Sequence, residues 1–359
     1  MQLLSKINGQ KRNLWLTYGM VILAFVIMQT MIATGSISRL LLGLLIPLCV
    51  YVILAVSLNF TVGIMGELSI GHAGFMCVGA FSGAFFSVVV QDSGMSPTLR
   101  FLLALVIGAI MAGIFGFLIG IPVLRLHGGY LALVTLAFGE IIKNIVNIIF
   151  IGRDSTGLHF TIIDSRSMEL GADGEMLING PLGILGIPRD STFIIGFILV
   201  LITIFIITNM MNSRAGRAIM AIRDNRIAAE SIGINVTKYK LLAFTISASL
   251  AGVAGVLFAH NFSTLAATSQ NFGYNMSIMI LVFVVLGGMG NIRGSIIAAV
   301  VLTVLPEMLR GLADFRMLMY SVLLILMMIL NWAPRAIEFR ERYGLKAFLQ
   351  KRKNAKEGN

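Results

Sequence analysis

Apolar stretches of about 20 residues recur along most of this chain and decide what it can fold into. A helix of that length crosses the ~30 Å hydrocarbon core of a bilayer. Hydrophobic residues make up 57% of the 359 residues and charged residues 12%, against roughly 45–50% and about 25% in soluble domains. The sequence therefore predicts an all-α polytopic membrane protein. A soluble protein with a very large core is the alternative.

We predict about ten transmembrane helices, with broken or re-entrant segments where glycines cluster. The segment 75–91 is short and rich in glycine, and 274–290 leads directly into a glycine cluster, so both are open to a re-entrant arrangement. The first apolar run is longer than the roughly 7–15 apolar residues of a signal peptide, so we expect it to remain as a signal anchor. The predicted spans are 14–33, 41–58, 75–91, 99–121, 130–151, 192–211, 241–260, 274–290, 295–311 and 317–333.

Positive charges set the expected orientation, because cytoplasmic loops of membrane proteins are enriched in Lys and Arg. With the N-terminus inside, cytoplasmic segments contain most of the 27 Lys and Arg residues, and an even number of spans returns the basic C-terminus to the same side. We expect a cytoplasmic tail at 1–13, a membrane domain at 14–333 and a basic cytoplasmic tail at 334–359. The net charge of +11 fits attraction to anionic lipid better than binding to nucleic acid.

The longest segment between predicted spans, 152–191, lies outside in this orientation and carries more acidic than basic residues. Long loops without a clear helix are often functional. Two interpretations stay open: a docking surface for an extracytoplasmic partner, or a self-packed cap over the helices. Cys49 and Cys77 both fall in apolar segments, so we expect core-filling thiols and no disulfide framework.

Two glycine-rich stretches, Gly63–Gly79 and Gly287–Gly294, interrupt the apolar pattern in opposite halves of the chain. Such interruptions indicate a transport pathway, because unwound backbone is tolerated in a membrane only where it is shielded from lipid. The first stretch contains Glu67, Ser69 and His72. These side chains are candidates for lining a cavity, with packing and hydrogen bonding as the alternative. A metal site or acid/base pair is disfavoured, because no cluster of His and Cys ligands accompanies them.

The predicted span 130–151 has a polar face formed by Glu140, Lys143, Asn144 and Asn147. Their spacing places them on one side of a helix. An ionisable side chain near the bilayer centre costs about 2.5–3.5 kcal/mol, so neither the glutamate nor the lysine is expected to face lipid. Either these residues line a hydrated path, or the two charges neutralise each other against a neighbouring helix.

The segment 212–240 carries six basic residues between two apolar blocks and is expected in the cytoplasm. Asp224 or Asn225 can cap a helix of about two turns, and Gly233 can end it. Small side chains on one side of this helix would let a partner surface approach closely; a solvated basic loop is the alternative. The sequence contains no Gly-Lys pair, so it has no P-loop, and any ATP would be used by a separate subunit.

Four motifs, in order, resemble those of the permease subunits of branched-chain amino-acid ABC importers. The resemblance covers roughly residues 41–311 and is greatest to the longer of the two permease types in these systems. The motifs are GELSIGHAGFMCVGAF at 66–81, GGYLALVTLAFGEI at 128–141, RDNRIAAESIGINVTKYKLLAFTISASLAGVAGVLFA at 223–259 and VLGGMGNIRGSIIAAVVLTVLPEMLR at 285–310.

The resemblance implies a bacterial inner-membrane permease that works with a second homologous permease subunit, two ABC ATPase subunits and an extracytoplasmic substrate-binding protein. ATP would be used by the partner subunits, with no cofactor or metal on this chain. The family's coupling helix corresponds to 223–233, here with Arg223, Asp224, Asn225, Ala228, Ala229, Glu230 and Gly233. The chain departs from the family pattern at STGLHFT in the outer loop and at NWAPRAI after the last span, which bears on substrate and docking.

We therefore expect a transport subunit without enzymatic activity, importing branched-chain or similar small amino acids. A urea or amide permease of the same family is the alternative for the substrate. An ion-coupled secondary transporter with Glu140 as its proton carrier is the alternative from another class.

Overall fold

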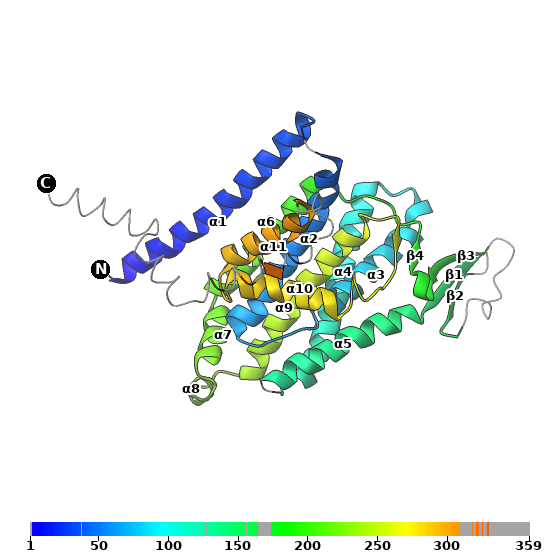
Figure 1. Cartoon of the computed structure of the whole chain (residues 1–359). Coiled ribbons are helices and arrows are strands. Elements are labelled where there is room, and N and C mark those ends of the chain that lie inside the picture. Colours follow the sequence, from blue (N-terminus) through cyan, green and yellow to red (C-terminus); the bar gives the residue numbers. More distant parts are fainter. Residues whose placement is uncertain are drawn as a thin grey trace. The chain divides into compact units, whose positions relative to one another are not determined.

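The computed structural model describes residues 2–36, 38–126, 128–154, 157–163 and 174–308, together with 318, 321–322, 325 and 329. It divides into two compact units, 1–299 and 300–359. Most of the described residues of unit 1 form helices (Figure 1). The helices are α1 (Gln2–Ala33), α2 (Arg39–Asn59), α3 (His72–Val89), α4 (Pro97–Val123), α5 (Gly129–Asn147), α6 (Phe193–Asn212), α7 (Arg214–Asp224), α8 (Arg226–Ser231), α9 (Val236–Ala259), α10 (Tyr274–Gly287) and α11 (Ile292–Met308).

The expectation of a helical polytopic membrane protein is confirmed. Among the described residues, seven helices are long and apolar enough to cross a membrane. Of the other predicted spans, 274–290 corresponds to α10, which is apolar but only 14 residues long. The span 295–311 overlaps α11, and 317–333 lies almost wholly outside the described residues. The total of about ten therefore stays a prediction. The seven candidate spans are Trp15–Ala33, Leu41–Met65, His72–Val89, Pro97–Val123, Gly129–Asn147, Phe193–Asn212 and Val236–Ala259.

Several helices begin at a residue whose side chain accepts a hydrogen bond from the first turn. Ser38 caps α2, Thr192 caps α6, Ser213 caps α7 and Asn235 caps α9. Such caps satisfy backbone N–H groups that have no partner inside the helix. Short polar residues at the ends of the apolar blocks thus fix where these four helices start.

Helices α3, α4 and α9 form a closely packed group because small residues line their contacts. A Cβ added at Gly252 of α9 would come within 2.5 Å of the carbonyl oxygen of Gly108 on α4. Gly79 of α3 lies against the backbone of Gly252. Cys77 is buried within this group, and Cys49 is buried on α2; both are free thiols, as predicted.

A small five-stranded sheet extends from the segment 152–191, where no strand was predicted. The order is β2-β1-β3-β4-β5, with antiparallel pairing throughout. Its last strand comes from the connection between α9 and α10, so the sheet fastens two distant segments together. The strands are β1 (Phe150–Asp154), β2 (Gly157–Thr161), β3 (Glu175–Asn179), β4 (Ile184–Leu185) and β5 (Thr264–Leu265).

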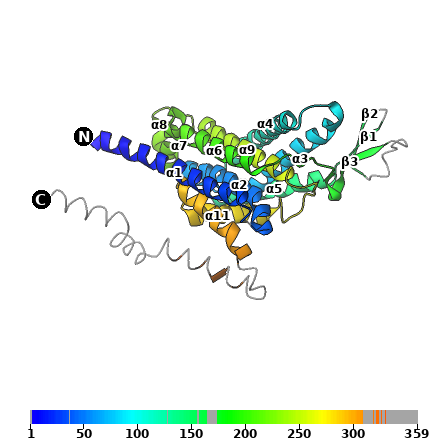
Figure 2. The ribbon, with the colours of Figure 1, turned by 90° about the horizontal axis from the view of Figure 1, so that it is seen from above.

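The sheet and the short helices α7 and α8 lie at opposite ends of the helical bundle of unit 1 (Figure 1). Figure 2, turned by 90°, shows the same separation. Helix α9 runs between the two ends, since it starts five residues after α8 and is followed by β5. The sheet and the two short helices are therefore connected through the same helix.

Candidate functional site

The first glycine-rich stretch contains the end of one helix and the start of the next. After α2 the chain continues as one π-helical segment, η1 (Phe60–Met65), which ends at Gly66. Gly66 adopts a φ of 79°, a left-handed conformation that glycine accommodates readily. Residues 67–71 are non-helical, and α3 starts at His72. The stretch is a break between two candidate spans, in which 61–65 completes the first and 72–79 begins the second.

Two of the predicted pathway residues lie in this break and differ in their surroundings. Glu67 forms an ion pair with Lys240 at the start of α9, with both side chains largely buried. Ser69 is buried, and its hydroxyl has no hydrogen-bond partner among the described residues; the same holds for Thr61 in η1. A buried hydroxyl without a partner is uncommon and requires an explanation.

His72, the third candidate in this stretch, takes part in a buried hydrogen-bond network and does not pair with Glu67. Its Nε2 lies 2.8 Å from the hydroxyl of Ser57 on α2. Ser247 of α9 donates to the carbonyl of Ser57 at 2.6 Å. The hydrogen bonds through Ser57 thus join α2, α3 and α9, which fits the packing and hydrogen bonding that the sequence left open.

The second glycine-rich stretch meets the first. Between α10 and α11 the backbone turns at Gly288 and Gly290, with φ values of 92° and 80°. The N–H of Gly290 donates to Asn59 Oδ1 at 2.7 Å, and Asn59 Nδ2 donates to Ser295 on α11 at 2.9 Å. A Cβ at Gly290 would lie 3.4 Å from the carbonyl oxygen of Gly63 in η1. The two interruptions therefore lie side by side.

The polar face of α5 holds the connection between α9 and α10. Glu140 accepts a hydrogen bond from the N–H of Tyr274 at 2.7 Å, at the start of α10. Lys143 donates to Glu140 at 2.5 Å and to Ser269 at 2.9 Å. The glutamate and lysine thus pair with each other. Asn144 is exposed and is not part of this contact, so its role in a transport path stays a prediction.

Asn147 completes this contact, since its amide donates to the carbonyl of Ala267 at 3.0 Å. Residues 140, 143 and 147 share a strip that meets the connection, whereas position 144 is rotated by about 100° from 143. The side that faces the 264–274 connection is therefore narrower than the sequence indicated.

The predicted coupling helix is α8. Asn225, one of two predicted caps, accepts a hydrogen bond from the N–H of Ala228 at 3.0 Å. Gly233, with a φ of 85°, follows its end as expected. Ala229 is buried between Ile222 of α7 and Val236 of α9. The helix is therefore fixed to both neighbouring helices by its buried face.

The opposite face of α8 is open. Ile227 of α8 and Ile232, the residue that follows the helix, are 80% and 75% exposed, which is unusual for large apolar side chains outside a membrane span. Glu230 pairs with Arg226 at 3.0 Å on the exposed surface. Asp224 pairs with Arg223 at 2.9 Å, so the charged residues of this segment are mostly paired with each other.

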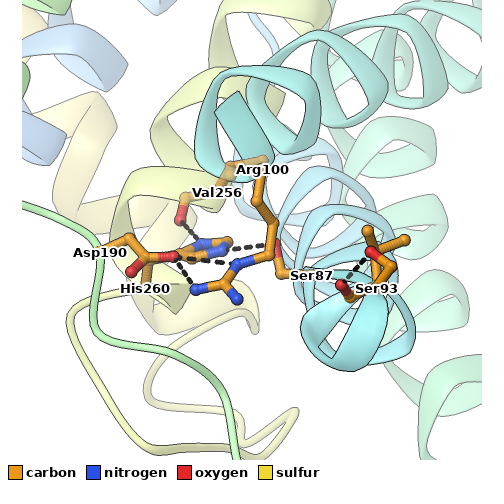
Figure 3. Close-up of polar contacts among 7 residues, drawn as sticks. Ser87, Ser93, Arg100, Asp190, Val256 and His260 are labelled. Atoms are coloured by element: carbon orange, nitrogen blue, oxygen red, sulfur yellow. Dashed lines mark hydrogen bonds and ion pairs between the residues drawn. The ribbon is translucent and has the colours of Figure 1, made fainter. Parts of the chain in front are cut away.

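A buried polar cluster at the sheet end was missed by the sequence analysis (Figure 3). Arg100, at the start of α4, forms an ion pair of 2.7 Å with Asp190, in the segment between β4 and α6. His260 follows α9 and lies 2.8 Å from the hydroxyl of Ser87 on α3. Because the carbonyl of Val256 can only accept, the 2.9 Å contact to it requires a proton on Nδ1 of His260.

The sequence signal for this cluster is weak, since each residue stands alone at the end of an apolar block. Arg100 and Asp190 are 90 residues apart, and Ser87 and His260 are 173 apart. A polar residue repeated at the same end of successive spans is the one sign that could have pointed to it.

The chain is similar in sequence to known membrane permease components. The family described as "Branched-chain amino acid transport system / permease component" matches residues 40–331. The chain is 36% identical over 299 residues to the "High-affinity branched-chain amino acid transport system permease protein LivM" of Salmonella typhimurium and of Escherichia coli, covering 80% of this chain and 67% of each relative. It is 23% identical over 329 residues to the "Fructose import permease protein FruG" of Bifidobacterium longum, covering 89% of this chain and 88% of that relative. No solved structure matches the chain.

The family model matches most of the chain, and the described residues include seven candidate membrane spans. The chain is a multi-pass membrane protein and belongs to the family of permease components of branched-chain amino acid transport systems.

Proposed function

We propose that this chain is the permease subunit of an ABC importer for branched-chain or similar small amino acids. It would pair with a second homologous permease subunit, receive substrate from an extracytoplasmic binding protein and contact two ATPase subunits. ATP would bind to those partners, while this chain would carry no cofactor, no metal and no enzymatic activity of its own. The proposed substrate class follows the printed description of the two LivM relatives.

The observation that carries the proposal is the construction of α8. Its inner face packs on Ile222 and Val236 through Ala229, while Ile227 and Ile232 are exposed. A short helix that is capped, anchored on one side and apolar on the other fits insertion into a groove on a second protein. Displacing it would move α7 and α9 with it.

The charge distribution supports a cytoplasmic position for α7 and α8, with both termini on the same side. The sheet would then lie outside, where a binding protein can dock on the segment 152–191. Its strand β2 exposes Leu158 and Phe160. Exposed apolar side chains of this kind mark interaction surfaces on membrane and soluble proteins alike.

The proposed pathway passes the break between α2 and α3. Amino acids are zwitterions, so a path for them needs hydrogen-bonding groups without fixed partners. The hydroxyls of Ser69 and Thr61 meet this requirement among the described residues. Glu140, by contrast, is paired with Lys143 and bound to the N–H of Tyr274. Those contacts hold its carboxylate in place and make it a poor proton carrier.

Reconstitution tests the proposal directly. The chain is purified with the ATPase, permease and binding-protein subunits of its transport system and placed in liposomes. Uptake of leucine, isoleucine or valine that requires ATP inside and binding protein outside is the expected result. Uptake driven by a proton gradient without ATP would refute the importer assignment. Calorimetry of the binding protein with amino acids, urea and short amides decides the substrate.

Orientation is tested separately with single cysteines. Because Cys49 and Cys77 are buried, a membrane-impermeant thiol reagent should label Ile227→Cys only from the cytoplasmic side. Ile163, which is 82% exposed near the sheet, should be labelled as Ile163→Cys only from the outside. The reverse pattern would contradict the proposed topology.

A further inference from the structure

We propose that Arg223 is a positioning residue that carries the displacement of α8 into the membrane, by holding the carbonyl of Gly63 in the broken segment η1. Gly63 in turn lies against Gly290, so one side chain connects the end of α7, directly before α8, to both glycine interruptions. The inference rests on the proposed function, because it needs a partner that displaces α8.

The first support is the position of the guanidinium group. Arg223 is the second-to-last residue of α7 and lies two residues before Asn225, the cap of α8. Its Nη1 donates to the carbonyl of Gly63 at 3.1 Å, while Nε and Nη2 donate to Asp224 at 3.1 and 2.9 Å. The planar guanidinium thus binds two groups at once, which fixes its orientation.

The second support is the room made for this side chain. A Cβ at Gly66 would lie only 2.6 Å from Cγ of Arg223. Gly66 is also the residue that ends η1 in the left-handed conformation. The absence of a side chain at this position lets the arginine pass under the end of the segment and reach the carbonyl beyond it.

The third support is the acceptor. Gly63 lies in the last turn of η1, where carbonyls have no donor inside the helix. The N–H groups of Gly66 and Glu67 both donate to the backbone carbonyl of Thr61. Arg223 supplies the donor for Gly63, and its charge strengthens the bond. A hydrogen bond of this kind is lost when its atoms move apart by about 1 Å.

The fourth support is the contact between the interruptions. Asn59 accepts from Gly290 and donates to Ser295, and a side chain at Gly63 would overlap the backbone of Gly290. Movement of η1 would therefore shift the turn between α10 and α11. A partner that displaces α8 in one nucleotide state would favour one arrangement of both turns over the other, as a two-state equilibrium requires.

The experiment compares Arg223→Met with Arg217→Met in the complete reconstituted transporter. Arg217 is a matched control, because it also lies on α7 and also donates from Nη1 to a backbone carbonyl, that of Asn212 at 3.0 Å. Substrate taken up per ATP hydrolysed is measured for each. Arg223→Met should lower this ratio about tenfold, equivalent to about 1.4 kcal/mol between the two states, while ATP hydrolysis continues. Arg217→Met should keep the wild-type ratio, and Arg223→Lys should recover part of it.

An unchanged ratio in Arg223→Met, or an equal loss in Arg217→Met, would overturn the inference. A wild-type complex without ATP-dependent uptake would instead refute the proposed function. Hydrogen exchange on the wild-type complex gives a second test that does not depend on assembly of the variant. Trapping nucleotide on the ATPase subunits should change exchange at 60–66 and 288–291 together with 223–233. A change confined to 223–233 would also overturn the inference.

Discussion

Lys240 and Glu67 form a largely buried ion pair although they are 173 residues apart in the sequence. The lysine is the fifth residue of α9, which follows α8, and the glutamate lies in the break between η1 and α3. A buried ion pair stabilises a fold little compared with apolar packing, but removing one partner leaves an uncompensated charge. The pair therefore joins the start of α9 to the broken segment, as a second connection in addition to the Arg223 hydrogen bond.

Glu67→Gln should lower the free energy of unfolding by about 3–5 kcal/mol, because it leaves the Lys240 ammonium buried without a counter-charge. The double variant Glu67→Gln with Lys240→Met should regain most of that loss. Thermal unfolding can be followed by a thiol-reactive dye, since Cys49 and Cys77 are buried until the protein unfolds.

Arg226→Met serves as the control for that series. It removes the exposed pair with Glu230, and exposed pairs contribute about 0–1 kcal/mol. A double variant no more stable than Glu67→Gln alone would show that the ion pair is not the source of the loss.

Ser87→Ala should destabilise the sheet end of the bundle by about 1–3 kcal/mol, because it leaves a buried ring nitrogen of His260 without its partner. Ser93→Ala is the matched control shown in Figure 3: its hydroxyl is exposed and donates only to the nearby carbonyl of Val90. Ser93→Ala should change the free energy of unfolding by no more than about 0.5 kcal/mol. Equal melting temperatures for the two variants, measured with the same dye, would contradict a stabilising role for the histidine network.

Local features of the fold could be predicted from the sequence, whereas long-range pairings could not. The cap at Asn225 and the stop at Gly233 depend on residues within one helical turn. The burial of Cys49 and Cys77 follows from their apolar surroundings. By contrast, the partner of Glu67 and the contact of Asn59 with Ser295 join residues 173 and 236 positions apart. The spacing of residues within a helix or strand cannot predict contacts between residues so distant in the sequence.

The sheet was missed for a different reason. Its strands have two to five residues, which is too short for an alternating pattern to stand out from a loop. The edge strand β5, which pairs with β4, comes from the connection after α9 and is distant in the sequence. Asn144 shares the polar side of α5, but the connection between α9 and α10 contacts only the strip through 140, 143 and 147.

Gly252→Ala should destabilise the isolated subunit by about 1–3 kcal/mol, because its methyl group would overlap the backbone of α4 at Gly108. Gly43→Ala is the matched control in α2, where an added Cβ has no described atom within 4 Å. There the better helix propensity of alanine should leave stability unchanged or raise it by up to about 1 kcal/mol. Similar unfolding temperatures would mean that α9 and α4 can separate at little cost.

Ile227→Ser and Ile232→Ser should weaken association with the ATPase subunit without unfolding the protein. Both side chains are exposed at one end of the bundle, so their replacement should change stability by less than about 0.5 kcal/mol. If they fill a groove on the ATPase, losing either should raise the dissociation constant about tenfold, since central apolar anchors contribute more than about 1 kcal/mol each.

Ile163→Ser provides the matched control for these two variants, because Ile163 is equally exposed but lies near the sheet at the other end. It should leave ATPase binding unchanged, whether measured by co-purification or by titration of the detergent-solubilised subunit. Equal weakening by Ile163→Ser would mean that the apolar surface, and not α8, governs association. Retention of full binding by Ile227→Ser and Ile232→Ser together would remove the main argument for α8 as the contact through which ATP hydrolysis drives transport.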